Sequence, residues 1–366
     1  MLDVLFIEPY FGGSHRAFAE GYRRTSRHRI ELLTLPACKW KWRMRGGALY
    51  LADRLPDDPP EVLLVSDFLD LATLTALRPH PVADLPTIAY FHENQLTYPV
   101  REGEERDFQF GITNMTTCLA ADRVLFNSSY HRESFLDATD DLLGKMPDCI
   151  PKGVAERIRG RSEVVPVGVD LEPIDALRPQ AADREGPLRI LWNHRWEFDK
   201  APEAFFRVIE RLENVGLDYD LAVAGQSFRR APDVFERARR RFAHRLKVFG
   251  TVPSRDEYLR LLLESDVVVS TAIHEFFGIA VVEAVYAGCT PLLPHRLSYP
   301  ELIPDEAHGI CLYDSEDDLF DRLRQWALHP EKAREIDLRE AMARFDWKKT
   351  GPRLDGVLER LCGVID

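Results

Sequence analysis

Short apolar runs alternate with longer amphipathic stretches along almost the whole chain of 366 residues. Alternation of strand-like and helix-like segments is typical of doubly wound α/β folds built on parallel sheets. A chain of this length exceeds one ordinary core, so we expect two such domains. The runs that we interpret as strands form two groups, residues 2–7, 61–65, 87–91 and 122–126, and then residues 188–192, 219–224, 246–249, 266–270 and 290–293.

The boundary between the two groups is predicted after residues 164–170, which we interpret as a strand that ends in a turn. Pro173, Pro179 and a polar run from Gln180 to Pro187 follow, a composition that is typical of a linker. The expected division is an N-terminal domain at 1–170, a linker at 171–187, a C-terminal domain at 188–345, and a C-terminal helix at 346–366 that could pack back on the N-terminal domain.

Composition narrows the class of protein. Hydrophobic residues make up 45% of the chain and charged residues 30%, which fits a globular enzyme and excludes a disordered chain. No apolar run approaches the roughly 18–20 residues that cross a membrane, so we expect no integral membrane association. The six cysteines are scattered, and we expect a reduced, cytoplasmic protein.

The net charge of −12 argues at first against a nucleic-acid partner, but the charge is segregated. Residues 15–47 hold nine Lys or Arg against two Glu, and residues 221–247 hold eight against two acids. Such blocks can attract a polyanion locally while the rest of the chain stays acidic. Solvated helix faces explain at least part of the second block equally well.

A strand, a polar turn with a glycine and a helix follow one another around residues 266–284. Backbone N–H groups and the helix dipole meet at such a turn and favour an anion, above all a diphosphate. Gly278 lets a ligand approach the backbone closely. Glu275 lies at the turn and Glu283 two helical turns on, where carboxylates could bind sugar hydroxyls. The pattern indicates a sugar-nucleotide site, although an ordinary α/β unit with two solvated glutamates would look the same.

A second polar loop follows the strand 188–192 and carries Asn193, Arg195 and Lys200. Two cations that converge at a strand end can neutralise a diphosphate and stabilise it as a leaving group. The alternative is a pair of surface cations.

In the N-terminal half, polar residues also follow strands. Gly12, Gly13, Ser14 and His15 come after the first strand and could approach a phosphate or a sugar, or form a plain tight turn. Tyr90 and Phe91 end another strand and are followed by four polar residues that we expect to contact a sugar or an acceptor, His92, Glu93, Asn94 and Gln95.

Cations and tryptophans alternate at Lys39, Trp40, Lys41, Trp42, Arg43 and Arg45. Aromatic faces stack on bases and cations meet phosphates, so this segment is a candidate RNA contact, and a sugar or a membrane surface would use the same residues. We find no Asp-x-Asp motif at a strand end and no His/Cys ligand cluster, and we therefore expect no metal cofactor.

Taken together, these motifs resemble a known family. The segment from Glu275 to Glu283 is similar to the two-glutamate signature of family-four retaining glycosyltransferases of the GT-B fold, and Arg195 and Lys200 match that family's phosphate-binding cations. Residues 165–170 resemble its interdomain segment. Residues 91–99 and 39–43 resemble, more narrowly, the tRNA-queuosine α-mannosyltransferases.

The resemblance implies two Rossmann-like domains that face a central cleft, and transfer of mannose from GDP-mannose to the cyclopentenediol of queuosine in tRNA. It implies catalytic roles for His92, Glu275, Arg195 and Lys200, and no clear general base. Donor binding would involve Gly13, Asn193, Arg195, Lys200, Glu275, Phe277, Gly278, Ile279 and Glu283, with Glu283 on the ribose. The acceptor tRNA would contact His15, Lys39, Trp40, Lys41, Trp42, Arg43, Arg45, Glu93, Asn94 and Gln95.

Three other functions fit the sequence. The same chemistry could serve a lipid, glycan or small-molecule acceptor, and then the basic and aromatic segment would contact a membrane surface. The chain could be an RNA-binding protein without catalysis, although a pure binder has no need of Glu275, Glu283, Arg195 and Lys200. It could also be a sugar-nucleotide epimerase or hydrolase on the same fold.

Overall fold

The chain forms two compact units in the computed structural model, which describes residues 1–78, 82–101, 103–178, 185–227 and 232–365. The first unit comprises Met1–Gly168 together with Trp347–Asp366, and the second comprises Val169–Asp346. Part of the segment predicted as a linker, 179–184, lies outside the described residues. Helix α7 (Glu172–Leu177) lies within that predicted linker and belongs to the second unit.

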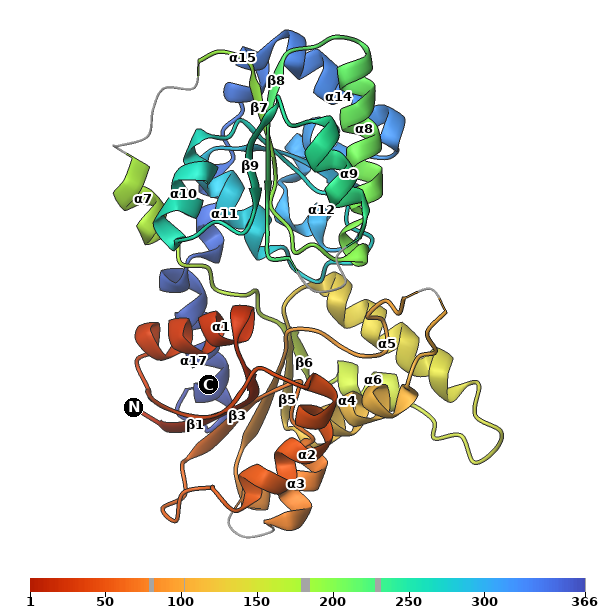
Figure 1. Cartoon of the computed structure of the whole chain (residues 1–366). Helices are drawn as coiled ribbons and strands as arrows, with labels where there is room; N and C mark the ends of the chain where they lie inside the picture. The colour runs from red at the N-terminus through yellow and green to blue at the C-terminus, as the bar shows by residue number, and fades with distance from the viewer. Residues whose placement is uncertain (79–81, 102, 179–184, 228–231, 366) are drawn as a thin grey trace. The chain divides into compact units, whose positions relative to one another are not determined.

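The first unit is built on a six-stranded parallel sheet in the order β2-β1-β3-β4-β5-β6. Its strands are β1 (Asp3–Phe11), β2 (Arg29–Pro36), β3 (Val62–Ser66), β4 (Thr87–Phe91), β5 (Arg123–Phe126) and β6 (Ser162–Val164). Its helices are α1 (Gly13–Thr25), α2 (Trp40–Ala52), α3 (Leu71–Leu77), α4 (Phe108–Ala120), α5 (Ser129–Leu143), α6 (Val154–Arg159) and α17 (Trp347–Leu361), with a 3₁₀ turn η1 (Val82–Asp84). Figure 1 shows these helices on both faces of the sheet.

The second unit repeats this plan with the order β12-β11-β10-β7-β8-β9. Its strands are β7 (Leu188–Trp192), β8 (Tyr219–Ala224), β9 (Leu246–Gly250), β10 (Val267–Val269), β11 (Thr290–Pro294) and β12 (Leu312–Tyr313). Its other helices are α8 (Pro202–Asn214), α9 (Val234–Arg241), α10 (Arg255–Glu264), α11 (Ile279–Ala287), α12 (Tyr299–Leu302), α13 (His308–Cys311), α14 (Glu316–Leu328), α15 (Pro330–Arg334) and α16 (Arg339–Met342), with 3₁₀ turns η3 (Phe198–Lys200), η4 (Asp305–Ala307) and η5 (Ala343–Phe345). The prediction of two doubly wound α/β sheets is confirmed.

Two predicted details of the strands differ from the structure. Strand β2 falls in a segment that we treated only as a basic block, and β12 has no predicted counterpart. The strand predicted at 164–170 is instead β6, which ends at Val164. Pro166 follows β6 and lacks the N–H group that a continued ladder would need.

The chain's last helix, α17, packs against α1 within the first unit. The Tyr22 hydroxyl donates to Asp355 Oδ1 at 2.7 Å, and Arg27 forms an ion pair with Glu359. Trp347 packs tightly against two glycines, since a Cβ at Gly21 or Gly168 would lie 2.2 Å from its indole ring. The final segment therefore completes the core of the N-terminal unit.

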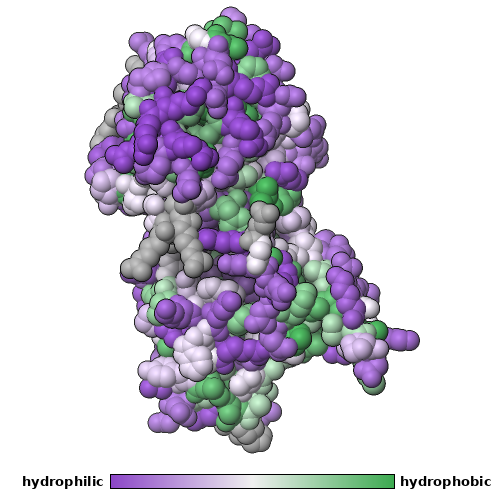
Figure 2. Space-filling view, turned by 45° about the vertical axis from the view of Figure 1, so that its right-hand side comes forward, coloured by the Kyte–Doolittle hydropathy of each residue, from purple (hydrophilic) through white to green (hydrophobic). Residues whose placement is uncertain are grey.

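No helix in the described ranges is long and apolar enough to cross a membrane. On the face shown in Figure 2, hydrophobic residues form separate patches among hydrophilic ones.

Candidate active-site residues in the two units

A buried ion pair lies at the carboxyl ends of β7 and β10 in the second unit. The Lys200 ammonium is 3.3 Å from Glu275 Oε2 and 3.1 Å from Asp199 Oδ2, and it donates to the His274 carbonyl at 2.7 Å. Burial alone lowers the pKa of Lys200, but the two carboxylates outweigh burial and raise it. The structure therefore brings together two residues that the sequence singled out separately, Lys200 and Glu275, and both are charged.

Arg195 belongs to the same region but is more accessible. Its guanidinium lies 3.4 Å from Glu197 Oε2, and half of its side-chain surface is exposed. Its positive charge acts against that of Lys200 and lowers the pKa of the lysine, so the two cations are within electrostatic range of each other. An anion between them would be attracted to both.

The helix α11 begins with the backbone that an anion site requires. Gly278 has a φ of 107° and is the N-cap, a conformation that side chains other than glycine rarely adopt. The first helical turn follows at Ile279, and the amides of Ile279 and Ala280 precede the first hydrogen bonds of the helix, which Val281 and Val282 donate to the Gly278 carbonyl at 3.0 Å. Glu275 Oε1 lies 3.5 Å from the Phe277 amide, so the carboxylate borders this turn.

Glu283 of α11 is buried and is held by two residues that the sequence did not single out. Its carboxylate pairs with the Arg255 guanidinium of α10 and neighbours the Tyr258 hydroxyl. Asn193 joins the group, because its Nδ2 donates to the Tyr258 hydroxyl and to the Ala280 carbonyl, both at 3.0 Å. Arg255 and Tyr258 were missed because a helix that starts Arg-Asp-Glu-Tyr reads as an ordinary solvated helix.

Several buried acceptors around these residues lack a hydrogen-bond partner within the described part of the chain. They include Asn193 Oδ1, His194 Nε2 and Asp199 Oδ1. Burial and the nearby Lys200 lower the pKa of His194 to about 4, so its imidazole is neutral at pH 7. Buried polar atoms are normally satisfied, and such atoms beside an anion-binding turn indicate a polar ligand.

The first unit has a second buried polar group at the carboxyl edge of its sheet. His15 of α1 bonds through Nδ1 to Glu8 Oε2 of β1 at 2.9 Å. Burial lowers the pKa of His15, but the Glu8 carboxylate outweighs it and raises the pKa to about 9. His15 was predicted as a tRNA contact, whereas the structure buries it in an ion pair.

His92 lies beside this ion pair at the end of β4. The rings of His92 and His15 are 4.3 Å apart, and burial together with the His15 cation holds the pKa of His92 well below 6.5. Its Nε2 is buried and has no hydrogen-bond partner among the residues described. A neutral imidazole with an unsatisfied nitrogen could bind a sugar hydroxyl.

These side chains also form the one group of His, Cys, Asp or Glu residues in the described ranges with metal-ligand spacing. The ligand atoms of Glu8, His15 and His92 all lie within 4.8 Å of one another. The expectation of no His/Cys ligand cluster is therefore wrong, because the fold joins residues from β1, α1 and the end of β4 that no sequence spacing connects. The raised pKa of His15 keeps its imidazole protonated at pH 7, so His15 and Glu8 form an ion pair.

The neighbouring polar residues divide between structure and surface. Asn94 is fully buried, and its Oδ1 accepts from the Leu96 and Thr97 amides at 3.0 and 2.9 Å, so it holds the turn. Gln95 Nε2 donates to Glu93 Oε1 at 2.9 Å, and both remain partly accessible. Gly13 has a φ of 54° and begins α1 with open space beside it.

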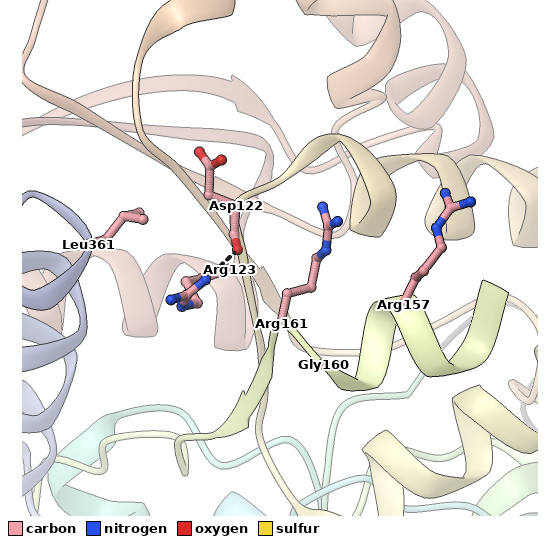
Figure 3. Close-up of a pocket in the computed structure, with 6 residues that line it drawn as sticks. All are labelled: Asp122, Arg123, Arg157, Gly160, Arg161 and Leu361. Atoms are coloured by element: carbon pink, nitrogen blue, oxygen red, sulfur yellow. Dashed lines mark hydrogen bonds between the residues drawn. The ribbon is translucent and has the colours of Figure 1, made fainter. Parts of the chain in front are cut away.

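A separate cavity of about 430 Å³ lies at the opposite edge of the same sheet, at the amino ends of β5 and β6. Figure 3 shows that Arg123, Arg157 and Arg161 border it. Arg161 donates to the Leu119 and Ala121 carbonyls at 3.0 and 2.8 Å and so caps the end of α4. None of the predicted site residues lines this cavity.

Comparison with known protein families and solved structures identifies the class of enzyme. A family model described as glycosyl transferases group 1 matches residues 173–342, and one described as the N-terminal domain of tRNA-queuosine alpha-mannosyltransferase matches residues 3–169. Sucrose-phosphate synthase from Thermosynechococcus elongatus has a TM-score of 0.73 at 15% identity, over 99% of this chain and 100% of that one. The Anabaena protein HepE in complex with UDP and glucose has a TM-score of 0.69 at 15% identity, over 98% and 100%. The fold is that of the GT-B glycosyltransferases, and the chain is a glycosyltransferase.

The relatives narrow the family. The chain is 39% identical over 338 residues to a tRNA-queuosine alpha-mannosyltransferase of Drosophila melanogaster, which covers 89% of this chain and 87% of the relative. It is 25% identical over 299 residues to a GDP-mannose-dependent alpha-(1-6)-phosphatidylinositol dimannoside mannosyltransferase of Mycobacterium tuberculosis (strain ATCC 25177 / H37Ra), over 79% and 71%. The chain belongs to the tRNA-queuosine alpha-mannosyltransferase family.

Proposed function

We propose that the chain transfers mannose from GDP-mannose to the cyclopentenediol of queuosine in tRNA, with retention of configuration at the sugar. The buried Lys200–Glu275 pair at the start of α11 carries the proposal, because it combines a cation for a diphosphate with a carboxylate for a sugar. The acceptor is proposed from the Drosophila relative. The donor is proposed from the mycobacterial relative and from others that are GDP-mannose-dependent mannosyltransferases.

The donor is proposed to bind along α11 and the loop after β7. The diphosphate would meet the amides of Gly278 and Ile279, the Lys200 ammonium and the Arg195 guanidinium. The ribose hydroxyls would bind Glu283, which Arg255 and Tyr258 hold in place, with the Asn193 amide oxygen nearby. The mannose would contact Glu275 and the Phe277 amide.

In the proposed reaction, the bond between the anomeric carbon and the diphosphate oxygen breaks, and GDP leaves with the electron pair. Lys200 and Arg195 stabilise the negative charge that develops on the leaving oxygen. The queuosine hydroxyl forms the new bond on the same face, and its proton passes to the departing phosphate oxygen. This route needs no protein base, and His92 would hold a sugar hydroxyl through its neutral imidazole.

We propose that the acceptor binds at the carboxyl edge of the first sheet. The residues proposed there are Gly13 and His92 for the sugar, Glu93 and Gln95 for the diol, and the exposed part of α2 with Lys39 for the RNA backbone. We place the reaction in the cytoplasm, because all six cysteines of the chain are free thiols, as is typical of a reducing compartment.

The test is transfer from radiolabelled GDP-mannose to tRNA with and without queuosine, with purified protein in EDTA. We expect label on queuosine-bearing tRNA alone. UDP-glucose, offered as a competing donor, tests the choice of donor. Equal labelling of tRNA that lacks queuosine would contradict the acceptor. Loss of transfer in EDTA that added Mg²⁺ or Zn²⁺ restores would contradict metal independence.

A further inference from the structure

The helix α2 divides its aromatic residues between an inner and an outer side. The Trp40 ring lies 5.0 Å from the Phe110 ring, in a cluster with Met44 and Phe68. Trp42 lies outside this cluster, and 61% of its surface is exposed. Trp40 therefore anchors the helix to the first unit, whereas packing within the protein does not explain a tryptophan at position 42.

The cations of the same segment divide in the same way. Arg43 donates to the Pro36 carbonyl at 3.0 Å, and Arg45 donates to Gln109 Oε1 at 3.0 Å. Lys39 and Lys41 are exposed, and neither side chain forms a hydrogen bond or an ion pair within the described ranges. The Lys41 ammonium lies over the edge of the aromatic cluster, 5.6 Å from the Trp40 ring centre and 5.9 Å from that of Phe110, and no carboxylate neutralises its charge among the described residues.

The Trp42 indole lies flat on the helix over Gly46. A Cβ at Gly46 would lie 2.6 Å from the ring, so glycine leaves the space that this orientation uses. The outer face of the ring is then open. An exposed apolar side chain alone is common, but here an open aromatic face shares one helical turn with exposed cations, the combination that unpaired nucleotides bind.

The position of the segment identifies the partner. Lys39 caps α2 directly after β2, so it lies at the carboxyl edge of the sheet, where Gly13 and His92 also lie. The acceptor is proposed to bind at this edge. Queuosine occupies the wobble position of tRNA, where bases are unpaired and can stack on an aromatic face.

We propose that Trp42 is a stacking platform for an unpaired base of the tRNA, with Lys39 and Lys41 on the adjoining phosphates. This inference rests on the proposed function, because it deepens the acceptor site of that reaction. Stacking on an exposed aromatic ring tolerates any base, so Trp42 supplies affinity for a single-stranded loop rather than selection of queuosine.

The test compares three full-length proteins, the wild type, Trp42→Phe and Trp42→Leu, in binding to queuosine-bearing tRNA at fixed salt. Trp42→Leu removes the π-face but keeps an apolar side chain, and we expect roughly 5- to 150-fold weaker tRNA binding. Trp42→Phe keeps a ring and should stay much closer to the wild type. Binding of GDP-mannose should be equal in all three, and equal melting temperatures show that the first unit, which holds Trp42, is folded.

Unchanged tRNA affinity in Trp42→Leu would overturn the platform while the proposed function stands. Failure of the wild type to bind or mannosylate tRNA would overturn the function itself, and the platform with it. A third comparison uses vesicles of phosphatidylcholine and phosphatidylserine. Wild-type binding to these vesicles that Trp42→Leu loses, with tRNA affinity unchanged, would assign the residue to a membrane surface instead.

Discussion

At the scale of single residues, the charge of Lys200 is the feature on which the proposed donor chemistry rests. The lysine is buried between Glu275 and Asp199, and removal of its charge would leave two carboxylates where a diphosphate should bind. We expect Lys200→Met to lower kcat/KM for GDP-mannose by roughly 100- to 1000-fold, measured by transfer of labelled mannose.

A second variant separates this effect from loss of folding. Removing one partner of a buried pair destabilises a protein by about 3–5 kcal/mol, so Lys200→Met alone should lower the melting temperature. The double variant Lys200→Met/Glu275→Gln still leaves the buried Asp199 carboxylate unpaired, so it should recover only part of the stability and none of the activity. Substantial activity in either variant would show that the lysine does not act on the leaving group.

Two buried histidines of the second unit make its stability depend on pH. Burial and the charge of Lys200 lower the pKa values of His194 and His274 to about 4, against 6.5 in an unfolded chain. Between pH 6.5 and 4 the unfolded chain binds protons that the folded chain does not, so the free energy of unfolding falls as the pH falls.

Each histidine contributes a slope of up to about 1.4 kcal/mol per pH unit in that window. Denaturant titrations at pH 7, 6 and 5 should show this loss, and His194→Asn should make it shallower. A slope that the substitution leaves unchanged would mean that His194 is not the titrating group.

The residue scale also shows where sequence reasoning stopped. The pairing of Lys200 with Glu275 was within reach, since both follow strands whose carboxyl ends meet at one edge. The roles of Glu8 and Arg255 could not be predicted, because each depends on a partner from another element. The partner of Glu8 is His15, and that of Arg255 is Glu283. Burial is equally hidden, and it turned His15 from an expected RNA contact into part of an ion pair.

At the scale of elements, the start of α11 depends on one backbone conformation. Gly278 has a φ of 107°, and a Cβ there would lie 3.2 Å from Leu302. We expect Gly278→Ala to cost roughly 1–2 kcal/mol in backbone strain and to raise the KM for GDP-mannose as the first turn shifts.

Gly216 offers a matched control. It has a φ of 71° with open space around it, in the turn between α8 and β8. Gly216→Ala should lower thermal stability similarly and leave the donor KM unchanged. Equal changes of KM in both variants would point to a general loss of stability.

The predicted strands illustrate the same distinction between central and peripheral elements. The inner strands β3, β4 and β5 were found because strands buried on both faces are continuous apolar runs. Strands β2 and β12 were missed, and both are edge strands. β2 carries Arg29 and Glu31 on its exposed side, and β12 has only two residues.

At the scale of the whole molecule, charge counted along the sequence overstates what an RNA can use. In the second basic block, Arg241 pairs with Glu210, Arg245 with Asp218 and Lys247 with Asp220, while residues 228–231 lie outside the described ranges. In the first block, Arg27 and Arg29 pair with Glu359 and Asp3. Of the three cations in the second block only Arg241 lies on a helix, α9, whereas Arg245 precedes β9 and Lys247 lies in it, so ion pairing and not a solvated helix face accounts for the last two.

This distribution predicts which cations set the salt dependence of tRNA binding. Each phosphate contact contributes about 0.7–0.9 to the slope of log K against log salt concentration. Lys39→Gln/Lys41→Gln should therefore reduce the slope by roughly 1.4–1.8. The matched control is Arg29→Gln/Arg211→Gln, which removes the same net charge from cations already paired with Asp3 and Asp317. If Lys39 and Lys41 contact phosphates directly, only their variant changes the slope. Equal changes in both variants would mean that the net charge of the protein, and not these contacts, sets the salt dependence.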